Sequence, residues 1–290
     1  MTWATVGPQR NPKRWIYRLC LALAVGFSLL GAVELASWKA DRARLRALGI
    51  AITAPAQDEA ERLTRLTDWL FRNVKPRKNW SYHLWRKLDA TPIQILEDGG
   101  NCEDKSKLLT AILRELDVAS SLAMLSRCEG CRLTHTVAIV RTRTGWTIAD
   151  PAFGMTFPDH QGGFHTIQAL RADPSLLQGR LAELRALRGP ADVINNYKLA
   201  TDHHAHLTTV NWNKNALTRL VAASIRAAGA EPWSTPRPLF LDDPKQFFAL
   251  FGFGGAIAWG LLALLLRARG TSHAMVLRRV GTDAAAHTQS

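Results

Sequence analysis

The sequence is poor in acidic residues, and it lacks the signatures of the common nucleic-acid-binding folds. Its 24 Asp and Glu stand against 37 Lys and Arg, which leaves a formal net charge of +13 at pH 7. No zinc-finger, RNA-recognition or helix-turn-helix pattern accompanies this charge. We therefore interpret the positive charge as arginine flanks of membrane segments and a basic surface, and we expect no nucleic-acid partner.

Cysteine is also scarce, with four residues in the chain. Cys20 lies in an apolar run, whereas Cys128 and Cys131 are separated by only two residues. In an extracytoplasmic domain this pair would form a short-loop disulfide, which is the interpretation we prefer. The alternatives are a redox dithiol, or half of a zinc site that residues such as His160 and His165 would complete.

Two apolar runs are each long enough to cross a bilayer. The first covers residues 19–38 after a basic tail at residues 1–18, and the second covers residues 247–266 before a basic tail at residues 267–290. A span needs about 20 apolar residues, so both runs predict transmembrane helices that bind the lipid bilayer. A cleavable signal peptide is the alternative for the first run, but no clean cleavage site follows it. The arginines beside the membrane predict cytoplasmic tails and an extracytoplasmic domain between the spans.

The segment between the runs divides into three parts. Residues 39–90 should be helical, and within them Asp58 to Val74 carries an apolar stripe predicted to pack on the helix that begins at Cys102. Residues 91–155 form the expected core, and residues 156–245 a helical extension. Thr91 and Pro92 predict the N-cap and first turn of a short helix at the start of this core.

The stretch Gly99-Gly100-Asn101-Cys102 organises the core. The two glycines free the backbone to turn, and the cysteine then opens a helix with an apolar face that should end near Asp117. The positive end of a helix favours the negatively charged thiolate of a cysteine. Cys102 is therefore the candidate nucleophile.

Two strand-like runs follow this helix and predict a hairpin. They extend from Leu133 to Arg141 and from Trp146 to Asp150, with a turn-forming segment between them. Pairing Asp150 with Val137, or with His135, places the side chains of His135 and Asp150 on one face within directly opposite or diagonal reach.

These residues supply the parts of a thiol enzyme. A thiol needs a base to become a thiolate, and the base needs an acceptor that orients it and supports its positive form. Cys102, His135 and Asp150 are the candidates for these three roles. His165 is an alternative base, but it lies outside any clear strand, so we prefer His135. An inert buried Cys102 beside an ordinary strand-end Asp150 is the structural alternative.

The pattern G-x-C-x-D-K-x-x-L-L on a helix, a histidine on a strand and Asp-Pro after the next strand resembles the transglutaminase-like superfamily. The resemblance covers roughly Thr91 to Phe153 and is closest to the bacterial transglutaminase-like cysteine proteinases, although Asn101 stands where they usually have an acidic residue. It implies an α+β, papain-like core with the Cys102 helix packed on an antiparallel sheet. It also implies a Cys-His-Asp triad and acyl-enzyme chemistry.

The resemblance further implies an oxyanion hole shared by the Cys102 N–H and an upstream side chain. Gln94, Trp80 and Trp85 are the candidates, with Gln94 preferred. No cofactor is required; a calcium site of the kind that some family members carry would involve Asn101 and Glu103, and the departure at Asn101 counts against it.

We therefore expect a cysteine peptidase or amide hydrolase anchored in the bacterial inner membrane, acting on a protein or peptide substrate at the cell envelope. Two alternatives remain open: an acyltransferase that cross-links proteins, and a non-catalytic binding module. An intact triad argues against the binding module, because a scaffold has no physical need for a base directed at a thiol. Redox chemistry at Cys128 and Cys131 is the weakest alternative, since the pair falls in a turn between strand-like runs.

Overall fold

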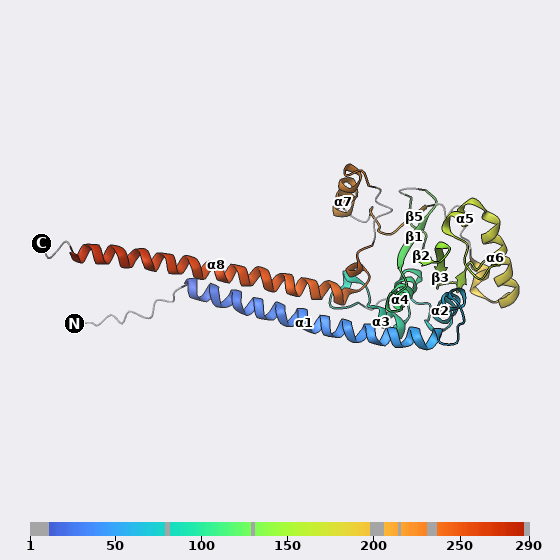
Figure 1. Ribbon diagram of the computed structural model, residues 1–290, viewed down its shortest axis with the longest axis horizontal. Coiled ribbons are helices and arrows are strands. Elements are labelled where there is room, and N and C mark those ends of the chain that lie inside the picture. Colours follow the sequence, from blue (N-terminus) through green and yellow to red (C-terminus); the bar gives the residue numbers. More distant parts are fainter. Residues whose placement is uncertain are drawn as a thin grey trace. The chain divides into compact units, whose positions relative to one another are not determined.

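The computed structural model describes residues 12–78, 82–128, 131–197, 206–213, 216–230 and 237–286 (Figure 1). The chain divides into two compact units, one made of residues 1–38 and 245–290 and the other of residues 39–244. The first unit contains the apolar helices, and the second contains the sheet and the candidate site residues.

Two long helices supply the apolar segments. Helix α1 extends over Pro12–Thr53 without a break between the first apolar run and the charged residues that follow it, and α8 extends over Pro244–Ala286. Both contain a stretch long and apolar enough to cross a membrane, each with a mean hydropathy of 2.1. Within the first unit the two helices approach closely at glycine, since a side chain at Gly252 would meet the backbone of Gly31.

The second unit is built on an antiparallel five-stranded sheet with the order β4-β3-β2-β1-β5. Its strands are β1 Ser120–Ser126, β2 His135–Thr142, β3 Gly145–Asp150, β4 Met155–Thr156 and β5 His206–Thr208. The short β5 pairs with β1, so the segment after residue 156 is not purely helical as the sequence predicts. A strand of three residues is too short to produce an alternating pattern that sequence inspection detects.

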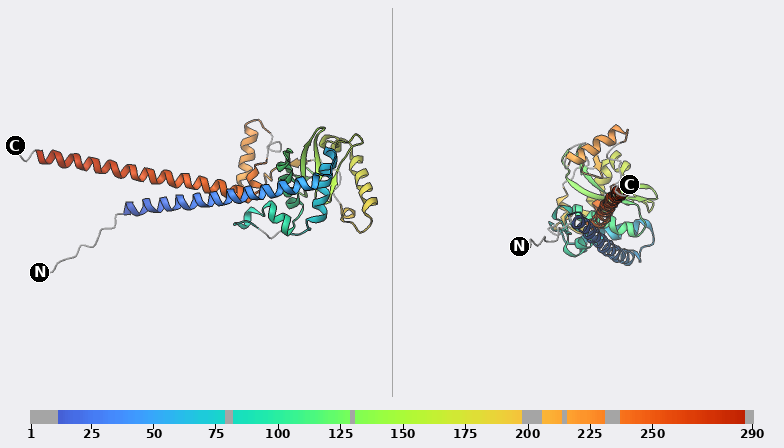
Figure 2. Two further views of the ribbon diagram at one scale, coloured as in Figure 1. Left: turned by 60° about the horizontal axis from the view of Figure 1, so that its bottom comes forward. Right: turned by 90° about the vertical axis from the view of Figure 1, so that its left-hand side faces the viewer.

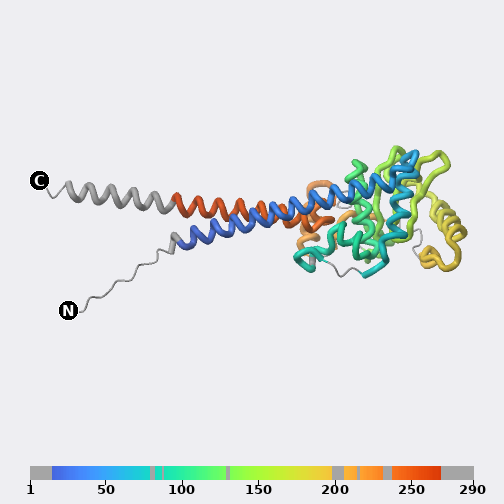
Figure 3. Tube along the Cα trace, turned by 90° about the horizontal axis from the view of Figure 1, so that it is seen from below, coloured from blue at the N-terminus to red at the C-terminus, as the bar shows by residue number. Residues whose placement is uncertain are grey.

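Helices cover the sheet on both faces. They are α2 Glu59–Asn73, α3 Pro92–Asp98 and α4 Cys102–Glu115 on one face, and α5 Ile167–Ala172 and α6 Pro174–Arg188 on the other. The same unit also contains α7 Ala216–Ala227 and short 3-10 turns at Arg86–Leu88, Val193–Asn196 and Leu239–Leu241. The predicted cap at Thr91 is present, since Thr91 forms a capping box with Gln94 at the start of α3. The side chain of Asp58 accepts from the Glu61 N–H at the start of α2. Figure 3 follows the chain from the end of α1 into α2.

Alternate residues of the sheet contact two different hydrophobic clusters. Ala138, Val140 and Ala149 belong to a cluster with the apolar faces of α2, α3 and α4. Val137 and Ile148 belong to a second cluster with α5 and α6, the yellow-green helices beside the sheet in Figure 2. The predicted packing of α2 on the Cys102 helix is present in the first cluster, so the core already includes residues that precede Thr91.

The hairpin of β2 and β3 has the first of the two expected registers. Ala138 pairs with Ala149 and Ile139 with Ile148, so the next step of the ladder sets Val137 opposite Asp150. His135 then lies two residues further along β2, diagonally across from Asp150. The hairpin therefore brings a histidine and a carboxylate together at one end of the sheet.

Candidate active site

Cys102 is the first residue of α4, and the residues before it hold this helix end in place. The side chain of Asn101 accepts hydrogen bonds from the N–H groups of Glu103 and Asp104, and the Asp104 carboxylate accepts one from the Asn101 N–H. Gly100 is required here, because a side chain at this position would collide with Asp104. The thiol is thus presented from a firmly capped helix start and is partly exposed.

His135 and Asp150 form a short, buried hydrogen bond. The distance between His135 Nε2 and Asp150 Oδ2 is 2.7 Å, and both side chains are nearly inaccessible to solvent. Because Nε2 faces the carboxylate, the other ring nitrogen, Nδ1, is left for the thiol of Cys102. The side chain of Ser106, one helical turn beyond Cys102, donates to the Thr136 carbonyl at 3.1 Å and joins α4 to the strand that carries His135.

The second carboxylate oxygen of Asp150 is held by the turn that follows it. Asp150 Oδ1 accepts hydrogen bonds from the N–H groups of Ala152 at 3.0 Å and Phe153 at 3.3 Å. Pro151 lies between Asp150 and these two residues in the sequence, and its fixed φ favours the turn that points both amides back at the carboxylate. Asp150 is therefore oriented from one side by backbone amides and is left to face His135 from the other.

Two aromatic rings enclose the imidazole. The ring centroids of Phe153 and Tyr197 lie 5.6 Å and 6.5 Å from that of His135, both edge-on, and the two rings lie 4.7 Å from each other. Burial and the nearby charge of Asp150 raise the pKa of Tyr197 well above its usual value, so the phenol stays neutral. These residues keep water away from the bond between His135 and Asp150.

The environment favours the charged form of His135. Burial lowers its pKa, but the charge and hydrogen bond of Asp150, together with the hydrogen bond and charge of Cys102, outweigh this effect and raise the pKa to about 10. An imidazole with this pKa carries a proton at neutral pH and stabilises a thiolate beside it.

Residues 46–151 match the family model described as the transglutaminase-like superfamily. This segment is a transglutaminase-like domain. A solved structure of a provisionally named cysteine protease from Cytophaga hutchinsonii is 18% identical, covers 42% of this chain and 40% of that chain, and has a TM-score of 0.31. No curated protein matches the chain.

The start of α4 offers one candidate donor for the predicted oxyanion hole of the transglutaminase-like domain. The N–H groups of Glu103 and Asp104 bind the Asn101 side chain and that of Lys105 binds the Asn101 carbonyl. Within the described part of the chain, this leaves the Cys102 N–H as the amide of the first turn without an acceptor. An amide of this kind, at the positive end of a helix, can serve as an oxyanion donor.

The upstream side-chain donor stays a prediction. The side-chain oxygen of Gln94 accepts from the Thr91 N–H at 2.9 Å in the capping box of α3. Trp85 is half exposed beside the 3-10 turn Arg86–Leu88, and Trp80 lies outside the described residues. Neither Gln94 nor Trp85 lines the pocket beside Cys102.

The positions considered for metals have other partners. Asn101 caps α4, and Glu103 lies 3.5 Å from Lys107 Nζ. The described residues contain no group of three or more His, Cys, Asp and Glu side chains that could hold a metal ion. His165, the alternative base, lies in the loop before α5, where its carbonyl accepts from the Thr147 hydroxyl at 2.8 Å and its N–H donates to the Phe157 carbonyl at 2.9 Å.

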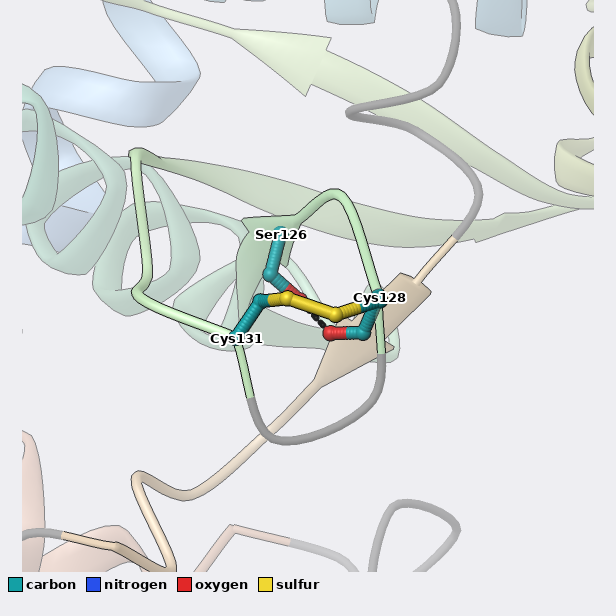
Figure 4. Close-up of a disulfide and its surroundings, with 3 residues drawn as sticks. All are labelled: Ser126, Cys128 and Cys131. Carbon is teal, nitrogen blue, oxygen red and sulfur yellow. Dashed lines mark hydrogen bonds between the residues drawn. A yellow bond between two sulfur atoms is a disulfide. The ribbon is translucent and has the colours of Figure 1, made fainter.

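Cys128 and Cys131 are joined by a disulfide in the turn after β1 (Figure 4). The Cys128 carbonyl accepts hydrogen bonds from the Ser126 hydroxyl at 2.9 Å and the Cys131 N–H at 3.1 Å, which tightens the turn. With both sulfurs bonded to each other, neither is available as a zinc ligand.

A pocket of about 410 Å³ opens beside Cys102 of the transglutaminase-like domain. Its lining residues are Pro76, Arg77, Lys78, Gly100, Asn101, Cys102, Lys105 and Ala152. Sequence inspection assigns no role to Lys105, although its place one turn after Cys102 puts both side chains on one side of α4. It likewise misses Tyr197, which is distant in sequence and carries no local signal.

Proposed function

We propose that the chain is a membrane-anchored thiol enzyme that hydrolyses amide bonds in a protein or peptide substrate at the bacterial cell envelope. The observation that carries this proposal is the arrangement around His135, with Asp150 at 2.7 Å from Nε2 and Cys102 as the remaining partner. The match of residues 46–151 to the transglutaminase-like superfamily supports it. A purely structural role would not require a buried imidazole held between a carboxylate and a thiol.

In the proposed reaction, the Cys102 thiolate attacks the amide carbonyl and a new carbon–sulfur bond forms. The negative charge that develops on the carbonyl oxygen is accepted by the Cys102 N–H at the positive end of α4. His135 gives its proton to the leaving amine as the carbon–nitrogen bond breaks, and Asp150 keeps the ring oriented. His135 then removes a proton from water, which hydrolyses the acyl-enzyme and restores the thiol.

The location is part of the proposal. Two helices are long and apolar enough to span a membrane. The arginines beside the membrane favour cytoplasmic tails, and the Cys128–Cys131 disulfide supports an oxidising compartment for the domain between them. A reporter enzyme that is active only outside the cytoplasm, fused after Ser290, is expected to stay silent; activity there would reverse the topology.

The test of the reaction compares the full chain with its Cys102→Ala variant in bacterial membranes suspended in ¹⁸O-labelled water. We expect peptides with newly formed, ¹⁸O-labelled C-termini by mass spectrometry only with the unaltered chain. Amine-linked products without the label would show that the acyl group is transferred to an amine and not to water. Identical peptide sets from the two proteins, with Cys102→Ala folded, would favour the non-catalytic binding module.

A further inference from the structure

Two lysines on α4 expose little surface to solvent but have different surroundings. Lys105 and Lys107 are each 2% exposed. Lys107 Nζ lies 3.0 Å from Asp89 Oδ2 and 3.5 Å from Glu103 Oε1. Burial lowers the pKa of Lys107, but the charges of these carboxylates outweigh it and raise the pKa above its usual value. Lys107 is therefore a buried cation with its counterions in the fold.

Lys105 has no such counterion among the described residues. Its ammonium donates one long hydrogen bond, 3.5 Å to the Phe71 carbonyl, and lies 5.9 Å from the centroid of the Phe71 ring. Burial lowers the pKa of Lys105, and the charge of Asp150 opposes this only in part. Asp150 is already engaged by His135 and by two backbone amides. A buried ammonium has three donors, so most of the hydrogen-bonding capacity of Lys105 is unused.

Lys105 lines the same pocket as Cys102. Arg77 and Lys78 add two more basic residues to the lining, and none of the described lining residues is acidic. The backbone of Arg77 is held against the segment just before α4, since its N–H donates to the Gly100 carbonyl at 3.1 Å. The pocket therefore combines the reactive thiol, a helix N-terminus and basic side chains, all of which attract an anion.

From this juxtaposition we propose that the pocket binds a carboxylate of the acyl donor, with Lys105 as its buried counterion. The inference rests on the proposed function and narrows it, because it makes acidic protein segments the preferred substrates. The carboxylate would lie on the acyl side of the bond that Cys102 attacks, and it would replace the missing partner of Lys105 when substrate binds. Arg77 guides the anion to the pocket from its exposed edge.

Alkylation of Cys102 tests the inference with two probes that differ in charge. Iodoacetate and iodoacetamide are attacked by the same thiolate, so the ratio of their rates cancels changes in thiol ionisation and reports the local potential. We expect Lys105→Met in the full chain to lower the iodoacetate-to-iodoacetamide ratio by about fivefold, as for the loss of one charge several ångströms away at intermediate dielectric. Arg77→Gln should lower the ratio by about twofold, because its charge is exposed and screened.

Lys75→Gln is the matched control, since it removes the same charge from the same loop outside the pocket lining. Its ratio should equal that of the unaltered chain. Equal ratios in Lys105→Met, Arg77→Gln and the control would overturn the carboxylate pocket while leaving the thiol enzyme intact. A Cys102 that reacts with neither probe would instead refute the proposed function.

Activated esters extend the test to acyl transfer. The mono-4-nitrophenyl ester of glutaric acid and 4-nitrophenyl butyrate differ chiefly in a terminal carboxylate. In both, the Cys102 thiolate forms a thioester, the ester carbon–oxygen bond breaks and 4-nitrophenolate leaves, which gives a measurable burst. We expect a faster burst with the glutarate ester, and loss of this preference in Lys105→Met. A preference for butyrate in the unaltered chain, or an unchanged glutarate preference in Lys105→Met, would overturn the inference.

Discussion

The replacement Asp150→Asn should disable His135 while leaving the shape of the site unchanged. In the structure, Asp150 Oδ1 accepts two backbone N–H groups and Oδ2 faces His135 Nε2. In the variant, the N–H groups of Ala152 and Phe153 will still donate to the side-chain oxygen of the asparagine, so its NH₂ group will face Nε2. Nε2 must then accept a hydrogen bond, and the proton of the neutral ring moves to Nδ1, the nitrogen that faces Cys102. A ring in this tautomer cannot take the proton of the thiol.

The structure sets the size of the effect. With a pKa of about 10, His135 is almost entirely protonated at neutral pH. If the replacement returns the pKa to its ordinary value of about 6.5, roughly one imidazole in ten stays charged at pH 7.5. The rate of Cys102 alkylation by iodoacetamide at this pH should therefore fall about tenfold, because the population of thiolate–imidazolium pairs falls by this factor.

The assay follows alkylation of the full chain in detergent micelles between about pH 5 and pH 10. Asp58→Asn is the control, since Asp58 caps α2 and asparagine caps helices equally well. The Asp150→Asn variant should lose reactivity at neutral pH and recover it only in alkaline solution. A pH profile that coincides with that of the unaltered chain, in a folded variant, would refute the assignment of Asp150 as the partner of His135.

Three further predictions concern stability. The folded pKa of His135, about 10, exceeds its unfolded value of 6.5, so its stabilising contribution is complete below pH 6.5 and is lost as the pH rises through 10. The free energies of unfolding of the full chain and of His135→Gln, measured by denaturation, should therefore converge across this pH range. A constant difference between the two would contradict this prediction. Gly99→Ala should lower the free energy of unfolding by more than about 2 kcal/mol, because Gly99 has a φ of +88° and a side chain would collide with the Lys75 carbonyl. A melting temperature equal to that of the unaltered chain would disprove the steric argument. Ile112→Ala should lower the free energy of unfolding by roughly 2–5 kcal/mol, because the side chain is fully buried between α4 and its neighbours. A decrease below about 1 kcal/mol in a denaturant titration would show that the surrounding side chains fill the cavity.

Local sequence determines much of the region around Cys102. The glycines before it allow the chain to turn, and Asn101 then starts the helix, because short polar side chains cap the free amides of a first turn. Alternation in the two strands limits the hairpin to two registers, both with His135 within reach of Asp150. These patterns are local in the chain, which is why Cys102, His135 and Asp150 can be named from the sequence as candidates for the nucleophile, base and carboxylate.

Tertiary structure decides what depends on distant partners. It selects the register that sets Val137 opposite Asp150, it brings Tyr197 from beyond α6 onto the imidazole, and it adds β5 to the edge of the sheet. It also separates two lysines that look alike in sequence: Lys107 lies beside two carboxylates, whereas Lys105, in the pocket of Cys102, forms no ion pair with a described residue. The charge balance of a buried side chain depends on every segment packed around it, so it is settled only when the whole domain folds.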